Sequence, residues 1–364
     1  MKTRVTQLRA ELHELCRASD RRIQLMEVCG THTVSAFRSG VRSLLPKNLR
    51  LVSGPGCPVC VTAQRHIDAA IDLATQPGVI LATYGDMMRV PGRAGSLERL
   101  RAGGADIRVV NSAKTALELA KTNHNRSVVF LGVGFETTAP ATAATVLAAR
   151  NDRVDNFCVL MCHKLVVPAM DALLQAGDVP IDGFLAPGHV SVIIGADAYR
   201  PIVTDHHRPV VVTGFEPDQI MMGLVALVEQ VVRGRAEVDN VYAGVVSNEG
   251  NPVALELLKR VFVIADAPWR ELGTIPHSGL ELAPDYLRFD ALRRFDVQLG
   301  EDEEHPLCRC GEVITGKAEP IDCPAFGRQC HPLNPIGPCM VSSEGTCAAW
   351  YKYNRTPTPV ESKP

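Results

Sequence analysis

Half of the twelve cysteines of this chain lie close together near the C-terminus: Cys308, Cys310, Cys323, Cys330, Cys339 and Cys347. The residues between them are rich in Gly and Pro, a composition typical of turns rather than of long helices or strands. Soft thiolates gathered in such a segment bind zinc or an iron–sulfur cluster, or they oxidise to disulfides. We therefore expect a small cysteine-rich domain at this end of the chain.

The rest of the chain indicates a reducing compartment for these thiols. Its first residues, MKTRVTQLRAELHELCRASD, place charges and Leu at helical spacing and lack the apolar core of a signal peptide. The longest apolar stretch, from Ile220 to Val232, is interrupted by Glu229 and Gln230 and is too short to span a bilayer. We expect a cytoplasmic protein with no membrane segment, in which clustered cysteines are more often metal-binding or catalytic than structural.

Charge and composition exclude several classes of partner. The formal net charge is −2 and aromatic residues make up 5% of the chain, so a basic field and stacking platforms for nucleic acid are both lacking. No P-loop occurs, and GVGFET is not a GxGxxG fingerprint, so nucleotide and NAD binding are not supported. A length of 364 residues predicts two or three domains.

Most of the chain has the pattern of an α/β protein, in which apolar runs alternate with helical stripes. Near-continuous runs of Val, Ile and Leu are typical of buried parallel strands, and their alternation with helices implies βαβ units. The expected strands are Ile23–Val28, Leu49–Val52, Val79–Thr83, Ile107–Val110, Val128–Val133, Val159–Met161, Gly183–Ala186, Pro209–Val212 and Val241–Val246. The expected helices are Ala63–Ala74, Ala113–Lys121, Pro140–Ala149, Ile220–Val232 and Pro252–Val261.

An internal similarity predicts two related halves. The segment Val128–Ala149 resembles Val210–Gln230, because each has a strand, the letters GFE, a turn and a helix. We expect an α/β fold of two similar parallel-sheet, Rossmann-like domains plus a smaller cysteine-rich iron–sulfur domain. The expected ranges are 1–40 for an N-terminal helix and strand, 41–133 and 134–265 for the two α/β domains, and 266–364 for the C-terminal domain.

Several polar motifs begin where an expected strand ends, which is the edge of an open α/β sheet where ligands bind. In MEVCGTH, Cys29 follows a strand directly and His32 comes three residues later. Both side chains could reach one metal, or the histidine or a helix end could lower the pKa of the thiol. The alternative is a small buried cysteine followed by a capping Thr.

The motif GPGCPVC is more specific. Cys57 and Cys60 have the spacing of a pair that closes a tight disulfide, and a helix expected to start near Thr62 would stabilise a thiolate there. A zinc half-site is the competing interpretation. We favour a redox pair, because no second CxxC follows at zinc-ribbon spacing.

Three other motifs supply polar groups at strand ends: GFETTAP with Glu136 and Thr137, APGHVS with His189, and MCHK with His163 and Lys164. Taken singly, each has a simpler interpretation as a capped helix start or a structural histidine. Their convergence on one side of the sheets, beside the cysteine motifs, favours a functional site.

In the tail, spacing separates two groups of cysteines. Four thiolates satisfy a [4Fe–4S] cluster, and surplus cysteines beside a cluster can relay electrons by thiol–disulfide exchange. Structural zinc, which also takes four cysteines, remains the alternative. The four candidate ligands are Cys323, Cys330, Cys339 and Cys347, and the surplus pair is Cys308 and Cys310.

The motifs MEVCGTHT, GPGCPVCVT, YGDMMRVPG, GFETTAP, APGHVS, GFEP and DCPAFG…CMVSSEGTCAA together resemble the HypD family of hydrogenase maturation proteins. They follow the order of that family from about Gln24 to Tyr351. The chain departs from the family pattern at Ala325, Pro338, Thr346 and Trp350, and none of these departures removes a cysteine.

The resemblance implies an assembly scaffold with a redox function, on which the Fe(CN)₂CO unit of [NiFe]-hydrogenase is built. The implied partners are a HypC-type chaperone and a HypE-type donor that carries cyanide as a thiocyanate. Cys29 would ligate the iron ion, with Cys57 and Cys60 close by as the redox pair and further metal candidates. The implied [4Fe–4S] ligands are Cys323, Cys330, Cys339 and Cys347. The side chains implied to orient ligands or move protons are His32, Glu136, Thr137 and His189.

Two other classes of function stay open. One is an iron–sulfur thiol–disulfide oxidoreductase that resembles ferredoxin:thioredoxin reductase in its chemistry. The other is a zinc-stabilised interaction protein without enzymatic activity. Reduction of a protein disulfide without iron at Cys29 favours the first, and a colourless, zinc-loaded preparation favours the second.

Overall fold

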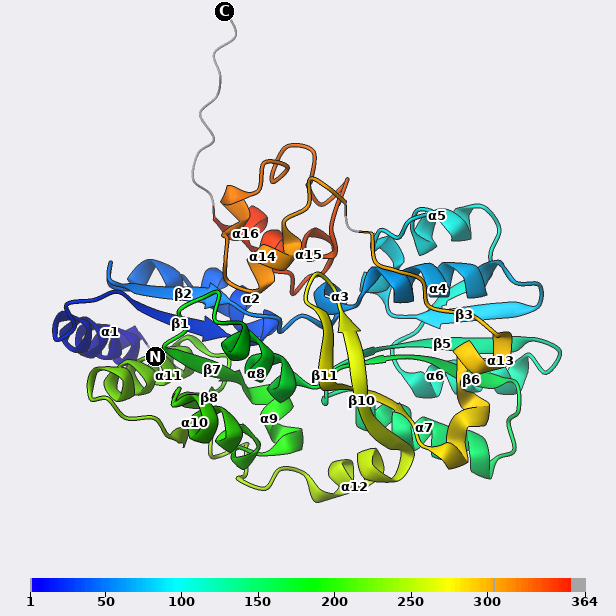
Figure 1. The fold of residues 1–364 in the computed structure, drawn as a ribbon, viewed down its shortest axis with the longest axis horizontal. Helices are drawn as coiled ribbons and strands as arrows, with labels where there is room; N and C mark the ends of the chain where they lie inside the picture. Colours follow the sequence, from blue (N-terminus) through cyan, green and yellow to red (C-terminus); the bar gives the residue numbers. More distant parts are fainter. Residues whose placement is uncertain (1, 304, 355–364) are drawn as a thin grey trace, which may run out of the picture.

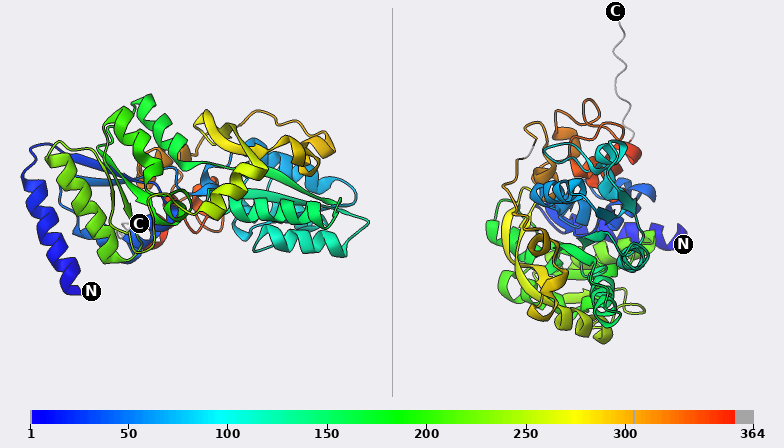
Figure 2. Two further views of the ribbon diagram at one scale, coloured as in Figure 1. Left: turned by 90° about the horizontal axis from the view of Figure 1, so that it is seen from below. Right: turned by 90° about the vertical axis from the view of Figure 1, so that its right-hand side faces the viewer.

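The protein is described here by a computed structural model that covers residues 2–303 and 305–354. Residues 1, 304 and 355–364, which belong to the first and last expected ranges, lie outside the described residues. Two parallel sheets lie side by side along the long axis, and a lobe of short helices sits over the junction between them (Figures 1 and 2). The chain is therefore an α/β protein with two Rossmann-like sheets and a cysteine-rich C-terminal region.

The first sheet has five strands, all parallel to their neighbours, in the order β2-β1-β7-β8-β9. Every residue of its three central strands is buried, which agrees with the apolar runs in the sequence. The strands are β1 (Ile23–Glu27), β2 (Leu49–Ser53), β7 (Gly183–Pro187), β8 (Val210–Thr213) and β9 (Val238–Asn240). The helices of this half are α1 (Lys2–Arg17), α2 (Gly30–Arg38), α8 (Val166–Ala176), α9 (Gly188–Ile194), α10 (Arg200–His206) and α11 (Pro217–Val232).

The second sheet has four parallel strands in the order β4-β3-β5-β6. They are β3 (Val79–Thr83), β4 (Ile107–Val109), β5 (Ser127–Gly134) and β6 (Phe157–His163). The helices of this half are α3 (Pro58–Val61), α4 (Gln64–Thr75), α5 (Leu97–Ala102), α6 (Ala113–Thr122), α7 (Ala139–Asn151) and α12 (Pro252–Val261).

The chain builds the sheets in an interrupted order. It forms β1 and β2 of the first sheet, crosses over to form β3 to β6 of the second, and then returns for β7 to β9. The ranges 41–133 and 134–265 therefore each contain strands of both sheets. One GFE segment lies at the end of β5 in the second sheet, and the other follows β8 in the first sheet. The strands before the upstream motifs YGDMMRVPG and APGHVS are β3 and β7, and they pair with β5 and β8 respectively.

One expected strand is wrong. The chain forms turns over Val241–Val246, and the last strand of the first sheet is the shorter β9 just before it. The side chain of Asn240 explains the difference. Its carbonyl oxygen accepts a hydrogen bond from Tyr242 N at 3.0 Å and its amide donates to Val246 O at 2.9 Å, which turns the chain out of the sheet.

Beyond the sheets, the chain forms an antiparallel hairpin and a lobe of short helices. The hairpin strands are β10 (Phe262–Trp269) and β11 (Gly273–Leu282). Its inner strand meets the end of β6, where Leu165 N donates to Ser278 O at 2.8 Å. The short helix α13 (Ala291–Phe295) follows, and the helices of the lobe are α14 (Cys310–Ile314), α15 (Pro338–Val341) and α16 (Thr346–Tyr353).

A single apolar cluster passes beneath the junction. It runs from Met26 in the first sheet through Cys57 and Cys60 to Val133 in the second, and it also includes Cys339 of the lobe. The relative positions of the two sheets and the lobe are therefore fixed by shared packing. Among the helices of the described residues, none is both long and apolar enough to cross a bilayer.

Candidate functional site

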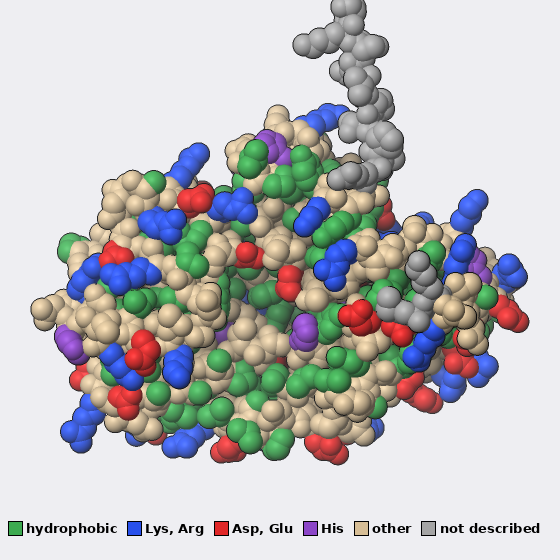
Figure 3. Space-filling view, turned by 180° about the vertical axis from the view of Figure 1, so that it is seen from behind, with side chains coloured by type: hydrophobic (Ala, Val, Ile, Leu, Met, Phe, Trp, Pro, Cys, Tyr) green, Lys and Arg blue, Asp and Glu red, His purple; other side chains and the backbone are tan. Residues whose placement is uncertain are grey.

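The carboxyl ends of both sheets border one cleft of about 380 Å³. The residues that line it come from four strand ends and from the lobe. They are Cys29 and Thr31 after β1, Gly56 and Pro58 after β2, Phe135 and Thr137 after β5, His189 after β7, and Glu344 of the lobe. Seen from behind, the molecular surface is hollowed below the lobe, between the two sheet halves (Figure 3). The sequence predicts that the motifs converge on one side of the sheets. In the structure they lie at the carboxyl edges of two sheets, which face each other across the cleft.

Cys29 lies at the start of α2, where its backbone is extended and the helix begins at the next residue. Position 56 in the neighbouring loop requires glycine, because a Cβ at Gly56 would lie 2.3 Å from Cys29 N and would displace Cys29. Gly30 N donates to Gly56 O at 3.3 Å and so joins the two cysteine loops. Burial raises the pKa of the Cys29 thiol to about 12, against the lowering that a helix end could bring. The free thiol therefore stays protonated at neutral pH, and a metal that bound it would have to displace this proton.

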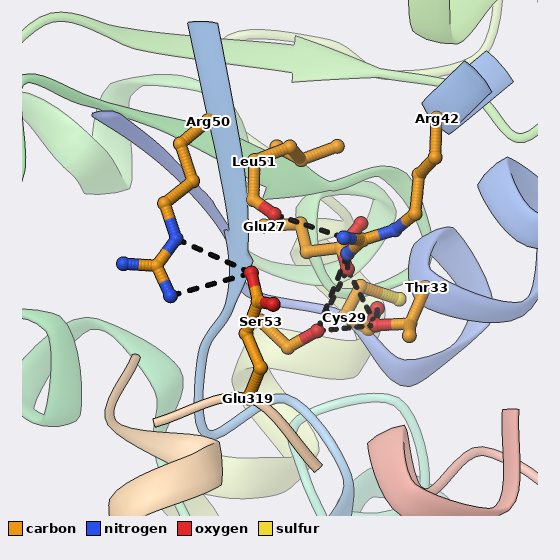
Figure 4. Close-up of polar contacts among 8 residues, drawn as sticks. All are labelled: Glu27, Cys29, Thr33, Arg42, Arg50, Leu51, Ser53 and Glu319. Atoms are coloured by element: carbon orange, nitrogen blue, oxygen red, sulfur yellow. Dashed lines mark hydrogen bonds and ion pairs between the residues drawn. The ribbon is translucent and has the colours of Figure 1, made fainter. Parts of the chain in front are cut away.

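A buried carboxylate fixes the strand end beneath Cys29 (Figure 4). Glu27 accepts a hydrogen bond from Arg42 at 2.6 Å, and hydroxyl groups donate to the same oxygen from Thr33 at 2.8 Å and Ser53 at 2.9 Å. Arg42 also donates to Leu51 O at 2.9 Å and so ties β2 into the network. Glu27 is fully buried, and one of its carboxylate oxygens accepts all three of these hydrogen bonds. It therefore holds β1, β2 and α2 in one arrangement.

Cys57 and Cys60 form a disulfide with a Cα–Cα distance of 5.2 Å. The helix expected to start near Thr62 is α4, which begins at Gln64. A separate short helix, α3, precedes it and begins at Pro58, so Cys57 stands at the N-terminus of α3. Both sulfur-bearing residues are buried. Gly56 and Pro58, on either side of Cys57, line the cleft, so the disulfide lies directly behind the cleft wall.

The two expected histidines lie on either side of one phenylalanine. Phe215 stacks on His189 with ring centroids 4.0 Å apart and lies 4.7 Å from the ring of His32. His189 is exposed and lines the cleft, whereas His32 is buried and does not. His32 Nε2 bonds to Gly214 O at 3.1 Å, and burial lowers the pKa of this imidazole to about 4. His32 thus supports the cleft wall from behind as a neutral ring.

The two residues expected from GFETTAP have different surroundings. Thr137 lines the cleft, while Glu136 turns into the protein, where Val166 N donates to its Oε1 at 3.0 Å. Burial raises the pKa of Glu136 to about 7, and its second oxygen has no partner among the described residues. Glu136 is therefore a carboxyl group that gains and loses a proton near neutral pH.

The lobe reaches the cleft through its SSEG loop. Glu344 accepts a hydrogen bond from Thr31 Oγ1 at 2.6 Å, and a Cβ at Gly30 would lie 2.5 Å from Glu344 O. On the other side of this loop, Asp86 of the YGD motif accepts hydrogen bonds from Ser342 and Ser343, at 3.3 and 3.2 Å. The loop is therefore held between a motif of each half and completes the cleft.

All six tail cysteines line one narrow apolar cavity inside the lobe. The thiols of Cys308, Cys310, Cys339 and Cys347 form a chain of contacts, and the contact with Cys310 together with burial raises the pKa of Cys308. Backbone N–H groups point at two of the sulfurs, from Ile336 to Cys330 at 3.4 Å and from Cys347 to Cys339 at 3.2 Å. In contrast, the Cys323 thiol donates outward to Leu307 O at 3.6 Å.

This donor set suits a thiolate-bound metal or cluster. Crowded, buried thiols do not all ionise without a cation, while N–H groups aimed at sulfur stabilise cluster thiolates. In residues 2–303 and 305–354, no three His, Cys, Asp or Glu side chains already stand as a metal cage, so the fit rests on donor chemistry. Four ligands are needed and six are present, and both an iron–sulfur cluster and zinc take four cysteines.

Sequence reasoning missed several residues that build the cleft. Of the aromatic residues of the two GFE motifs, Phe135 lines the cleft and Phe215 stacks on His189 at its wall. Glu344 and Asp86 join the lobe to the cleft. The repeated GFE was a usable signal for the two phenylalanines. The pairing of Asp86 with the SSEG loop had no such signal, because it links positions more than 250 residues apart.

Fold and site together define a class of protein: two facing α/β sheets whose strand ends, with a cysteine-rich lobe, enclose a cleft lined with thiol motifs.

The model of the family described as "HypD: Hydrogenase formation hypA family" matches residues 3–354, and the chain belongs to this family. It is 47% identical to "Hydrogenase maturation factor HypD" of Escherichia coli, over 96% of this chain and 94% of that protein. It is 46% identical to the protein of the same name in Cupriavidus necator, over 92% and 90%. It is also 42% identical to "Putative hydrogenase expression/formation protein MJ0993" of Methanocaldococcus jannaschii, over 92% and 93%.

Proposed function

We propose that this chain is a hydrogenase maturation factor, a scaffold that holds an iron ion at Cys29 while the ligands of Fe(CN)₂CO are added. Relatives that match nearly the whole chain carry the name of such a factor. The observation that carries the proposal is the junction of the motifs: the Cys29 loop is hydrogen-bonded to the Cys57 loop through Gly30 and Gly56, at a cleft closed by the cysteine-rich lobe. Low-spin iron with cyanide and carbonyl ligands needs a soft donor, and a thiolate is one.

The disulfide supplies the redox step. Release of cyanide from a thiocyanate breaks its carbon–sulfur bond and consumes two electrons and two protons, giving a thiol and hydrogen cyanide. The reduced Cys57–Cys60 pair provides both electrons and both protons as its disulfide closes. Cyanide gives up its proton when it binds iron, and Glu136, one residue from the cleft wall and with a pKa of about 7, is suited to accept it.

The proposed cluster ligands are Cys323, Cys330, Cys339 and Cys347. When bound, a [4Fe–4S] cluster there supplies one-electron transfer beside the disulfide. The chain's own contribution is to place the lobe helix α15 against α3, which carries Cys60. Thr137 and His189 line the cleft and orient what enters it, while His32 fixes the Phe215 ring behind them.

The proposed partners are a HypC-type chaperone, whose N-terminal cysteine would share the iron with Cys29, and a HypE-type donor that brings the thiocyanate. The cleft is open to solvent at the exposed His189, which leaves room for a partner segment. We place the chain in the cytoplasm, because ten cysteines besides the disulfide pair are free, and thiols persist in a reducing compartment.

The deciding experiment replaces the proposed iron ligand. We expect Cys29→Ala to keep its fold and its cluster but to lose the infrared bands of cyanide and carbonyl from the anaerobic complex with a HypC-type protein, together with hydrogenase maturation. Cys16→Ala, which removes another buried thiol far from the cleft, is the matched control and should keep the bands.

Retention of the bands in Cys29→Ala would disprove the assignment of the iron to this residue. The same measurement separates the competing function. A thiol–disulfide oxidoreductase of the ferredoxin:thioredoxin reductase type would show no such bands in the unmodified protein, and its disulfide reduction would survive the loss of Cys29.

A further inference from the structure

A second cavity, of about 670 Å³, lies between the end of β6, the β10–β11 hairpin and the segment around α13. None of the residues that line it lines the thiol cleft. Its floor carries two nitrogen-bearing side chains: Lys164, which directly follows β6, and His66 from the first turn of α4. The proposed function makes no use of this cavity.

The floor residues are almost completely enclosed. Their exposed fractions are 2% for Lys164 and 4% for His66. The Nδ1 atom of His66 has no hydrogen-bond partner among the described residues. Buried polar atoms without partners are uncommon, and beside a cavity they indicate a ligand or an ordered solvent molecule.

Lys164 has no counter-ion in the part of the chain that the structure describes. Its Nζ forms none of the described hydrogen bonds or ion pairs and lies 6.0 Å from the ring centroid of Trp269. The carboxylate that acts on it electrostatically, Asp302, is already paired with Arg65 at 2.9 Å. Burial lowers the pKa of Lys164 to about 8, as expected for an ammonium group taken out of water without compensation.

The charged residues at the rim of the cavity restrict the charge and size of a ligand that could enter. Asp266, Glu281 and Asp296 are exposed where they border it, and Asp290 is held by Leu292 N at 2.8 Å and Arg293 at 3.7 Å. An acidic rim repels a polyanion, while the lysine on the floor repels a metal cation. A small anion that passes the rim and meets the floor satisfies both conditions.

We propose that this cavity binds a small oxyanion, with Lys164 as its counter-ion and His66 as a hydrogen-bonding partner. A tetrahedral or planar oxyanion offers several acceptor atoms, which matches one ammonium and one imidazole group on the same floor. The hairpin forms the opposite wall through Gly279 and Leu280, so the site exists only when the hairpin is docked on β6.

The test uses the full-length protein and inorganic phosphate as the probe. We expect saturable broadening of the ³¹P resonance of phosphate, weakened roughly 10- to 100-fold in Lys164→Met because a charge-assisted hydrogen bond is lost. Lys114→Met removes an exposed lysine from α6 and is the matched control, which should bind phosphate as the unmodified protein does. Sulfate and bicarbonate, added at constant ionic strength with chloride as the reference, should compete.

His66→Gln gives a second, independent variant on another element and decides the question if Lys164→Met does not fold. The proposal is overturned if phosphate, sulfate and bicarbonate show no saturable binding to the unmodified protein. It is equally overturned if binding is the same in Lys164→Met and His66→Gln, or if Lys114→Met weakens it as much. Because no arm needs iron or a partner protein, a failure here leaves the proposed maturation role untouched.

Discussion

The thiol cleft and the cysteine-rich lobe touch each other, but different interactions stabilise the two regions. In the cleft, Cys29, Thr137 and His189 each follow a buried strand, so hydrogen-bonded sheets fix their positions without any metal. In residues 305–354 the lobe has no sheet, and its helices α14, α15 and α16 are no longer than eight residues. Helices that short are marginal alone, so side chains that meet at the centre of the lobe must hold it together.

Cysteines make up much of the buried interior of the lobe. Its local apolar cluster consists of Ala325, Cys330 and Met340, with Cys323 and Cys347 packed against it. If a metal centre joins these thiols, its binding energy becomes folding energy for the lobe but not for the sheets. The two regions should therefore respond differently to the same kind of substitution.

The largest effect should follow loss of a central thiol. In Cys339→Ser we expect loss of the proposed cluster, a fall of about four irons per chain and faster amide exchange throughout 308–353. Exchange of the β1 and β5 amides should stay slow, because neither sheet depends on the lobe for its hydrogen bonds. Iron analysis and hydrogen-exchange mass spectrometry measure both. Cys158→Ser, at another fully buried cysteine, is the control that should keep its iron.

The same measurement tests the choice of ligands. We propose Cys323 as a ligand, although its thiol points toward Leu307 O, whereas Cys310 touches both Cys308 and Cys339. If Cys310→Ser loses the iron while Cys323→Ser keeps it, the proposed set is wrong and the chain of touching thiols is the ligand set.

Sequence patterns predicted most of the strands but not which strands pair with each other. Helix Pro252–Val261 has the expected bounds, and β3 matches the expected Val79–Thr83, because apolar period and caps are local signals. Sheet membership is not local. The return of the chain to β7 beside β1 is set by pairing between residues about 160 apart, and no periodicity encodes that.

At the site, the sequence located every thiol motif but not the neighbours of each side chain. Placement of Cys29 and His189 at strand ends follows from the α/β pattern. The burial of His32 behind the cleft wall does not, because the ring of Phe215, which follows β8, lies against it. The burial that raises the pKa of Cys29 likewise depends on contacts with Gly56 and the lobe.

A smaller effect should come from the carboxylate beneath Cys29. Arg42→Met leaves Glu27 buried with only hydroxyl partners, and loss of one member of a buried ion pair costs about 3 to 5 kcal/mol in the free energy of unfolding. Arg50→Met is the matched control. It breaks the partly exposed pair with Glu319 of the lobe, at 3.3 Å, and should cost about 1 kcal/mol or less. Urea denaturation measures both, and equal losses would mean that the cleft is no more rigidly built than its contact with the lobe.

The smallest effect is a pH dependence confined to the sheet-built region. Burial raises the pKa of Glu136 from 4.5 to about 7, so the folded protein holds a proton there that the unfolded chain releases. Stability from this group is complete below pH 4.5, is lost as the pH rises to 7, and stays constant above it, a total of about 3 kcal/mol. In Glu136→Gln the amide oxygen still accepts from Val166 N and carries no charge, so this loss should vanish.

The difference in free energy of unfolding between the variant and the unmodified protein should grow in favour of Gln from pH 4.5 to 7. Glu216→Gln, the corresponding residue of the second GFE motif, is exposed and should show a smaller change. A constant difference for Glu136→Gln across this range would mean that the carboxyl is already ionised when buried, and would remove it as a proton acceptor at the cleft.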